Sequence, residues 1–383
     1  MSYCYVCKTI YDTNLIYENY QDMCLKCGQF NYQQKIKIAN LSSCVSLVTG
    51  IRQKIGLEIA LKILRCGGKV IGTTRFPYLT LYNYSKQKDY NIWKQNLIIY
   101  QCDFTNLNSV QKLITFVKTK KINIFINNAC QTIPPSDFYK TKITNLEKQI
   151  MFICTDVIEQ TIVYPTDADT LLSDIVNNDN KKIMQVLSTD LMMNEYIYFN
   201  QQQLILDCNN ININQLSNYH LELNKFSDIQ DINIKNNSSW SKSISDIDSK
   251  EILETIIINQ TVPTLIIHGI KDYMIKPRFI IQVTALEGQF NSNKTGLHAH
   301  TNMCKSAMNM LIRTLSEENE KDQFVFSINP GFVSGVNPQE DTHYPLTPVD
   351  GASRILHPII EYYNQKKLPK NWIHLRNYKI ESW

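Results

Sequence analysis

Two pairs of cysteines near the N-terminus could bind a metal ion. Cys4 and Cys7 form one Cys-x-x-Cys pair, Cys24 and Cys27 form the other, and residues 8–23 between them have the length of a small hairpin. This spacing is typical of four-cysteine zinc sites. Four thiolates complete a tetrahedral Zn2+ and leave no open position, so we predict a structural metal and not a catalytic one. A redox dithiol, which needs only one pair, is the alternative.

A glycine turn farther along the chain could bind a nucleotide. Gly50 and Gly56 separate an apolar run, residues 45–49, from a segment with helical periodicity that begins at Ile55. A strand that enters a helix through such a turn directs the free N–H groups of the first helical turn toward a bound diphosphate. Two glycines also occur wherever backbones pack closely, so the turn alone leaves both interpretations open.

The type of nucleotide depends on the next strand, residues 69–75, which completes a βαβ unit and ends at Arg75. An acidic residue there would bind an unmodified ribose, whereas an arginine accommodates a 2′-phosphate. Arg52 and Lys54 add positive charge next to the glycine turn, where the nucleotide is expected to bind. We therefore expect NADP(H) in preference to NAD(H).

Polar side chains also follow the two strands expected at residues 97–103 and 122–126. Asp103 could accept a hydrogen bond from an adenine amino group, or it could cap the helix that follows. Asn127 and Asn128 come directly after the later strand. Because buried amides are costly unless they bind something, we expect them to hold the strand ends and the cofactor ribose together.

The elements that must position these groups alternate between strand and helix. Strands are expected at residues 45–49, 69–75, 97–103, 122–126, 279–284 and 324–328, and helices at 248–265, 300–316 and 348–363. Residues 31–43 are interpreted as a short polar connection, and the segment that starts at Phe76 and Pro77 as irregular. The alternation predicts an α/β protein with a Rossmann-like, doubly wound parallel sheet.

The periodic pattern is interrupted between residues 139 and 239, where Asn-rich and Asp-rich stretches surround short amphipathic pieces such as residues 183–193. A plain loop of this length is uncommon, so we predict a partly ordered insertion of unknown role. Three units result. Residues 1–40 form a zinc-ribbon-like module that folds only with its metal, residues 41–138 and 240–383 form the Rossmann domain, and residues 139–239 form the insertion.

Composition restricts the class of protein. The chain has 383 residues, 43% of them hydrophobic, and a net charge of +4 without long single-sign blocks, which gives no reason to expect nucleic acid as a partner. No apolar run has the length of a membrane span. The 11 cysteines favour a reducing compartment, with the cytoplasm as the default. Incorporation into an organellar or cytoskeletal assembly is an open alternative.

Several motifs together resemble the short-chain dehydrogenase/reductase family over residues 44–365, apart from the insertion. They are Thr49-Gly-Ile-Arg-Gln-Lys-Ile-Gly56, Asp103, Asn127-Asn-Ala129, Asn259, Lys305 and Pro330-Gly331. Phrases near Arg75, Gly288 and His300 resemble a branch of the family with a cysteine-rich N-terminus. The resemblance implies these cofactor-binding residues: Gly50, Arg52, Lys54, Ile55, Gly56, Arg75, Asp103, Phe104, Asn127, Ala129, Lys305, Pro330 and Gly331.

The family reduces carbonyls or oxidises alcohols with a tetrad of Asn, Ser, Tyr and Lys. By position, Asn259 and Lys305 match, whereas Ala285 replaces the serine and Thr301 replaces the tyrosine. A threonine hydroxyl is far too weak an acid to replace a phenol whose pKa starts near ~10. The resemblance therefore implies the fold more firmly than the activity.

Other side chains could compensate for the missing groups. Thr284 neighbours the position of the lost serine, although strand alternation points it away unless the strand end is bulged. His298 and His300 could donate a proton, or they could be polar residues of a loop that leads into a helix. Cys304 could be a thiol of lowered pKa or a small core residue. Tyr344 could reach over from the loop after the sixth strand.

Two functions are compatible with the sequence. The first is an NADP(H)-binding oxidoreductase that acts on a carbonyl or alcohol held beside Asn259, Thr284, Thr301 and Lys305. The second is a catalytically silent subunit that docks protein partners through the zinc module and the insertion. In the family the helices before and after the fifth strand commonly form a dimer or tetramer interface, so a homo-oligomer is expected unless the insertion blocks that interface. The insertion could also be a lid.

Overall fold

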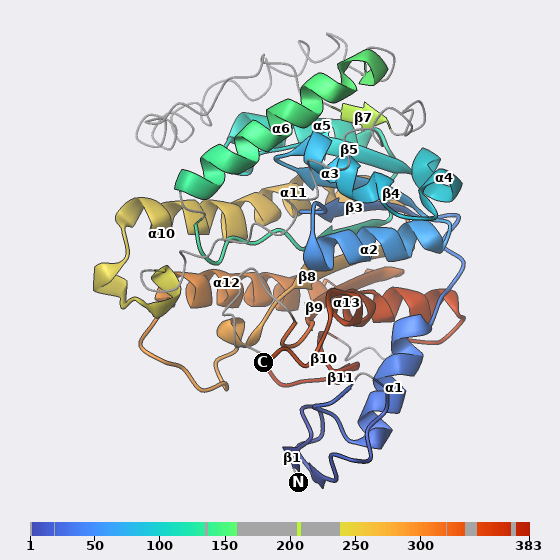
Figure 1. Cartoon of the computed structure of the whole chain (residues 1–383), viewed down its shortest axis with the longest axis vertical. Helices are drawn as coiled ribbons and strands as arrows, with labels where there is room; N and C mark the ends of the chain where they lie inside the picture. Colours follow the sequence, from blue (N-terminus) through green and yellow to red (C-terminus); the bar gives the residue numbers. More distant parts are fainter. Residues whose placement is uncertain are drawn as a thin grey trace.

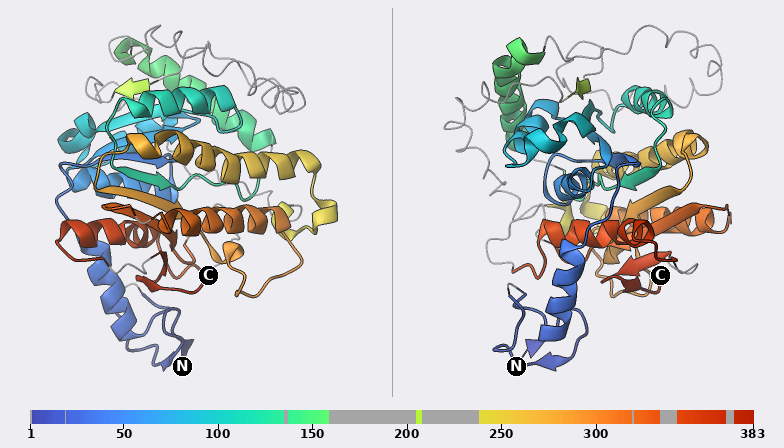
Figure 2. Two further views of the ribbon diagram at one scale, coloured as in Figure 1. Left: turned by 180° about the vertical axis from the view of Figure 1, so that it is seen from behind. Right: turned by 90° about the vertical axis from the view of Figure 1, so that its right-hand side faces the viewer.

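The computed structural model describes residues 2–18, 20–134, 137–158, 205–207, 238–318, 320–333, 343–368 and 373–383. Over these ranges the chain forms one large sheet with helices on both faces and a small N-terminal module at one end (Figure 1). The views in Figure 2 show that this module extends away from the sheet. None of the helices in these ranges has the length and apolar character that a membrane span requires.

The central sheet has nine strands in the described residues, in the order β11-β10-β9-β8-β6-β3-β4-β5-β7. Seven of them run parallel, and the outermost strand at each edge is antiparallel to its neighbour. The strands are β3 (Val45–Thr49), β4 (Lys69–Thr74), β5 (Leu97–Gln101), β6 (Ile124–Asn127), β7 (Ile205–Asp207), β8 (Arg278–Val283), β9 (Gln323–Asn329), β10 (His374–Arg376) and β11 (Lys379–Ile380). The predicted Rossmann-like parallel sheet is confirmed.

Helices cover both faces of the sheet. Helices α2 (Lys54–Arg65), α3 (Pro77–Ser85) and α13 (Pro348–Tyr363) bury their apolar sides in one core. Helices α5 (Leu107–Lys118), α11 (Val262–Ile270) and α12 (Ala299–Ser316) form the other core. In α2 the predicted periodicity is confirmed, because Ile59, Ala60, Ile63 and Leu64 are buried. This arrangement places the first turn of α2 at the carboxyl end of β3.

Two connections expected from the sequence are helical instead. Residues 25–36 form α1 (Leu25–Ile36), so the predicted polar connection over residues 31–43 is wrong in its first half. The helix forms because it packs on α13 and buries Asn31 there. The segment predicted to be irregular after Arg75 contains α3 and α4 (Tyr90–Trp93). Pro77 occupies the first turn of α3, a position that suits its fixed φ and missing N–H.

The helix predicted at residues 248–265 has a different form. It comprises α10 (Ser249–Ile256), a π-helical turn (Ile257–Thr261) and α11, and it ends five residues later than expected. Asp248 caps α10 by accepting a hydrogen bond from the Lys250 amide. Other boundaries differ by one or two residues; β5, for example, stops at Gln101 because the chain turns at Asp103.

Part of the predicted insertion is ordered. Helix α6 (Asp137–Ile158) packs on α3, and β7 pairs with β5 at the edge of the sheet. The insertion therefore covers the edge of the sheet that lies next to the predicted 2′-phosphate site. The amphipathic piece predicted at residues 183–193 lies outside the described residues.

The N-terminal module consists of a short antiparallel hairpin and α1. Strand β1 (Ser2–Tyr3) pairs with β2 (Ile10–Tyr11). The module has a small core of its own around Cys4, Tyr20 and Met23, which continues onto Val333 and Leu346 of the large domain. Helix α1 lies against α13 in both views of Figure 2.

Candidate nucleotide and metal sites

Close backbone approach explains both glycines of the nucleotide turn. Gly50 has a φ of +72°, and a Cβ there would lie 3.1 Å from the Cα of Ala129. A Cβ on Gly56 would lie 2.0 Å from the carbonyl oxygen of Gly50. Only glycine fits at Gly56, because the first turn of α2 sits directly on the turn that precedes it. Close packing of backbones, the alternative in the sequence analysis, is therefore present at this turn, and binding of a diphosphate there stays a prediction.

Positively charged side chains lie close to this turn. The guanidinium carbons of Arg52 and Arg75 lie 5.5 Å and 5.6 Å from the ring centroid of Phe76. The structure thus brings the two predicted arginines to one aromatic ring. Burial of its ammonium group, with a smaller contribution from Arg52, lowers the pKa of Lys54 to about 8. A phosphate at this turn would stabilise the charged form of all three side chains.

Asn127 and Asn128 connect the ends of neighbouring strands. The Thr49 hydroxyl donates to Asn127 Oδ1 (2.9 Å), and Asn127 Nδ2 donates to Gln282 Oε1 (2.8 Å). Asn128 Nδ2 donates to the carbonyl oxygens of Thr49 and Gly50, and the backbone amide of Ala129 donates to the Thr49 hydroxyl. These bonds join β3, β6 and β8 at their carboxyl ends. The predicted holding of strand ends is present, and Gln282 is a partner that the sequence did not indicate.

Asp103 organises the turn after β5. Its Oδ1 accepts hydrogen bonds from the backbone amide and the hydroxyl of Thr105. The cap of α5 is Asn106, which accepts from the Ser109 amide, so the alternative that Asp103 caps this helix is wrong. Phe104 beside it is buried. Binding of an adenine amino group by Asp103 stays a prediction.

Asn259 lies in the π-helical turn between α10 and α11. Such π turns inside helices occur frequently at functional sites. The Asn259 side chain is buried and makes two hydrogen bonds of 2.7 Å with the backbone of Gln131, one accepted and one donated. Gln131 lies two residues after Ala129, so Asn259 holds the loop that leaves β6.

Thr301 and Lys305 lie on α12, which contacts both the turn of residues 286–288 and the π-helical turn that holds Asn259. A Cβ on Gly288 would lie 2.9 Å from Lys305 Cβ, which shows how closely the turn of residues 285–288 packs on this helix. Thr301 lies one helical turn before Lys305 and is fully buried. The hydroxyls of Thr284 and Thr301 are buried without a hydrogen-bond partner among the described residues. Since buried hydroxyls are normally hydrogen-bonded, both have capacity left for a bound molecule or water.

Lys305 is half-buried and makes no hydrogen bond or ion pair with any described side chain. Its ammonium group therefore has three donors available for the predicted contact with the cofactor ribose.

The side chains considered as substitutes for the missing serine and tyrosine lie in different surroundings. Cys304 is fully buried, and burial raises its pKa to about 11, so the predicted reactive thiol is wrong and the small core residue is correct. His298 stacks on Trp240, with ring centroids 4.0 Å apart. His300 is buried 3.6 Å from Glu251, and burial lowers its pKa. Tyr344 packs against Phe332 at 4.9 Å.

Pro330 and Gly331 form the turn after β9. Gly331 has a φ of +91°, and its amide donates to Asn329 Oδ1 (2.9 Å). Arg354 Nη1 of α13 donates to the Pro330 carbonyl oxygen (3.0 Å). Helix α13 therefore supports the turn through this hydrogen bond. Arg354 was not predicted as a partner of Pro330, because no local pattern connects residues 24 positions apart.

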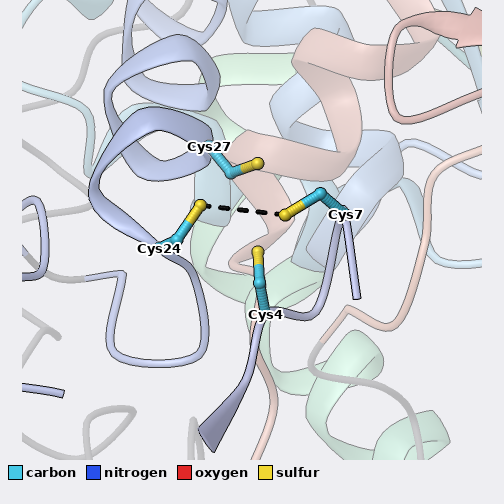
Figure 3. A group of neighbouring side chains, drawn as sticks. All are labelled: Cys4, Cys7, Cys24 and Cys27. Carbon is cyan, nitrogen blue, oxygen red and sulfur yellow. Dashed lines mark hydrogen bonds between the residues drawn. The ribbon is translucent and has the colours of Figure 1, made fainter. Parts of the chain in front are cut away.

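The four cysteines converge as the spacing predicted (Figure 3). Their sulfur atoms all lie within 4.8 Å of one another, and those of Cys7 and Cys24 are 3.8 Å apart. A tetrahedral zinc ion with Zn–S bonds of about 2.3 Å places its sulfurs about 3.8 Å apart. A hydrogen bond from Thr9 lowers the pKa of Cys7 to about 6, whereas burial raises that of Cys27. The cluster fits a tetrahedral thiophilic metal better than it fits a single dithiol.

These features define the class of protein. A parallel sheet with a glycine turn at its first strand-to-helix crossover is a Rossmann-type fold. The family model described as short chain dehydrogenase matches residues 44–161, which span β3 to α6. A short chain dehydrogenase from Burkholderia cenocepacia, solved in complex with NADP, has the same fold. Its TM-score is 0.51 at 11% identity, with 88% of this chain and 98% of that chain covered.

Two relatives in sequence are informative. An uncharacterised protein of Acanthamoeba polyphaga mimivirus is 27% identical over 398 aligned residues, which cover 97% of this chain and 73% of that protein. The (-)-isopiperitenone reductase of Mentha piperita is 37% identical over 87 residues, which cover 22% of this chain and 28% of the reductase. The first similarity includes the N-terminal module, and the second is confined to a short segment.

Proposed function

We propose that the protein is an NADP(H)-dependent oxidoreductase that acts on a carbonyl or alcohol group of a small molecule. The observation that carries the proposal is the pairing of Arg52 and Arg75 across Phe76, beside a turn that admits only glycine at position 56. Arg75 at the end of β4, with Arg52 of the turn after β3 near the same ring, suits a 2′-phosphate. The complex of the Burkholderia protein with NADP agrees with this assignment.

The residues of the site suggest which part of the reaction each side chain would perform. When bound, the cofactor supplies the hydride that converts a carbonyl carbon to an alcohol carbon. Thr284 and Thr301, whose hydroxyls lack partners among the described residues, would hold the substrate oxygen. Lys305 would bind the ribose and deliver the proton to that oxygen from its ammonium group, because a threonine is too weak an acid to do so. Asn259 would hold the Gln131 loop in place beside them.

The proposal is tested by fluorescence titration of the purified protein with NADPH and NADH, with the Arg75→Glu variant as control. We expect NADPH to bind more tightly than NADH, and the variant to lose that preference because a carboxylate repels the 2′-phosphate. Absence of binding to either nucleotide would reject the proposal. Tight NADPH binding would justify a screen of carbonyl substrates.

We also propose that the four cysteines hold a structural Zn2+ and that residues 1–40, 41–138 with 240–383, and 139–239 are the three units of the chain. The convergence of four sulfurs supports the metal. The described cysteines are not joined in disulfides, which suits a reducing compartment, with the cytoplasm as our proposal. Exposed Met303 and Met310 on α12, together with Leu253 on α10, support a homo-oligomer through these helices.

A second function is favoured by one observation. Ala285 and Thr301 stand where the family has its serine and tyrosine, and Thr301 is fully buried. A protein with these changes could serve as a catalytically silent subunit that keeps its cofactor. The double variant Thr301→Tyr with Ala285→Ser separates the two functions. New ketone reduction by NADPH would show a site that lacked only its donor, whereas intact NADPH binding without turnover would favour the silent subunit.

A further inference from the structure

We propose that the N-terminal four-cysteine module positions the Pro330–Gly331 turn, so that metal binding and cofactor binding are coupled, with Tyr5 as the positioning residue. The proposal rests on the proposed NADP(H) site, in which this turn forms one wall. Three observations carry it: a hydrogen bond from the module to the turn, a buried polar network behind that bond, and an apolar core shared by the two units.

The direct contact comes from a residue inside the first cysteine pair. Tyr5 lies between Cys4 and Cys7, and its hydroxyl accepts a hydrogen bond of 2.7 Å from the backbone amide of Phe332. A Cβ on Gly331 would lie 2.8 Å from the same hydroxyl. The Tyr5 amide in turn donates to the Asp22 carbonyl oxygen (2.7 Å), close to the second cysteine pair. Any rearrangement of the cysteine turns therefore moves the partner of Phe332.

A buried polar network lies behind this bond and joins the same two units. Asp350 at the start of α13 is fully buried and accepts hydrogen bonds from Tyr20 (2.6 Å) and Asn31 (3.1 Å) of the module. Lys35 of α1 lies 3.4 Å from the same carboxylate. The carboxylate therefore receives much of its neutralisation from the module. Outside the module, the described residues that donate hydrogen bonds to this carboxylate are reduced to Thr347, through its backbone amide and its hydroxyl.

Arg354 connects this network to the turn. Its Nη2 donates to Asn31 Oδ1 (3.0 Å) and its Nη1 donates to the Pro330 carbonyl oxygen (3.0 Å). The side chain is 2% exposed. A buried charge that loses one partner is costly, because water cannot replace the lost bond. A shift of Asn31 would therefore move the Arg354 guanidinium, and with it the Pro330 carbonyl oxygen to which the guanidinium donates.

The apolar contact is continuous with these bonds. Cys4, Tyr20 and Met23 of the module form one buried cluster with Val333 and Leu346, which flank the loop that follows the turn. The His343 ring also lies 2.6 Å from a carboxylate oxygen of Asp22. The module thus contacts both described ends of this loop.

Small four-cysteine modules fold only with their metal, so removal of the ion would withdraw Tyr5, Tyr20 and Asn31 from their partners. The Pro330–Gly331 turn would lose its support on that side, and the nucleotide would have to reorder it on binding. Linkage requires the reverse effect to be equal: bound NADPH must strengthen metal retention by the factor by which the metal strengthens NADPH binding.

The test compares Tyr5→Phe with Tyr3→Phe in the full chain. Tyr5→Phe keeps the ring and removes only the acceptor of the Phe332 amide, whereas Tyr3 is 72% exposed in the same module. We expect Tyr5→Phe to weaken NADPH binding by about 3- to 10-fold, the usual effect of one lost hydrogen bond, with zinc content unchanged. Tyr3→Phe should match the wild type. Amide hydrogen exchange at Phe332 should accelerate in Tyr5→Phe alone.

The second arm removes the metal from the wild-type protein with a chelator. We expect faster exchange at Phe332 and weaker NADPH binding, both restored when Zn2+ is added back, and slower zinc release in the presence of NADPH. Unchanged exchange at Phe332 after metal removal and in Tyr5→Phe would overturn the coupling, whatever the nucleotide result. Failure of the untreated wild type to bind NADPH would instead reject the proposed function, because the exchange measurement does not depend on nucleotide.

Discussion

The side chain of Asn259 is paired with the backbone of Gln131, its Oδ1 accepting from the amide and its Nδ2 donating to the carbonyl oxygen at 2.7 Å each. The pair joins a π-helical turn to the loop after β6, 128 residues earlier in the chain. Asn259 is therefore a positioning residue in this structure, since both polar atoms of its amide are already engaged by the backbone.

We predict that Asn259→Asp destabilises the protein by about 1–3 kcal/mol, because a carboxylate cannot donate to the Gln131 carbonyl oxygen and leaves two oxygens facing each other. Asn106→Asp is the matched control. Asn106 caps α5 by accepting from Ser109, and aspartate serves equally well as a cap. Chemical denaturation measures both variants. Equal stability of Asn259→Asp and the wild type would contradict the pairing.

Gly56 provides a second prediction. A Cβ there would lie 2.0 Å from the Gly50 carbonyl oxygen, so Gly56→Ala must displace α2 or the turn. We expect a loss of about 1–3 kcal/mol in the free energy of unfolding, together with weaker NADPH binding. At Gly296 an added Cβ meets nothing within 4 Å, and Gly296→Ala should change neither quantity. A Gly56→Ala variant that binds NADPH as the wild type does would mean that the turn is not the diphosphate site.

The sequence predicted the parallel sheet well, for a physical reason. Buried parallel strands such as β3 are short apolar runs, and amphipathic helices such as α2 carry a separate periodicity, so local patterns identify both. The cysteine cluster could be predicted from the sequence equally well, because metal ligands within one small module have characteristic spacings. Strands β10 and β11 were missed because they are too short to produce a pattern.

The contacts that complete the site were beyond local patterns. Gln131 and Gln282 meet Asn259 and Asn127 only after the chain has folded, and Arg354 reaches Pro330 from another element. For Cys304 the sequence left two alternatives open, a thiol of lowered pKa beside Lys305 and a small core residue. Burial in the α10–α12 contact raises the pKa of the thiol and selects the second. Whether a group is buried depends on tertiary packing, which a single helix does not reveal.

Lys54 gives a prediction about pH. In the protein without nucleotide its pKa is lowered to about 8, and a phosphate nearby would raise it because the anion favours the ammonium form. Binding at high pH must therefore be accompanied by proton uptake. We expect NADPH affinity to fall as pH rises above 8, reaching about tenfold weaker binding at about pH 9 than at about pH 7.

Arginine substitution separates Lys54 from other titrating groups. Lys54→Arg should remove the fall in affinity above pH 8, because a guanidinium stays protonated. Lys62 lies on the same helix with its pKa also lowered to about 8, but it contacts Ser353 and the Lys35 carbonyl oxygen. Lys62→Arg should therefore keep the pH dependence of the wild type. If the fall persists in Lys54→Arg, Lys54 does not contact the nucleotide.

The metal assignment is tested with Cys24→Ser. The Cys24 sulfur is one of four that lie within 4.8 Å of one another, and a serine hydroxyl does not replace a thiolate on zinc. We expect zinc content, measured by atomic emission, to fall well below that of the wild type, and residues 1–40 to become sensitive to protease because the module depends on its metal. Cys130→Ser is the control, since Cys130 is exposed and lies outside the cluster. Zinc content that is the same in both variants and in the wild type would reject binding by four thiolates and favour a dithiol instead.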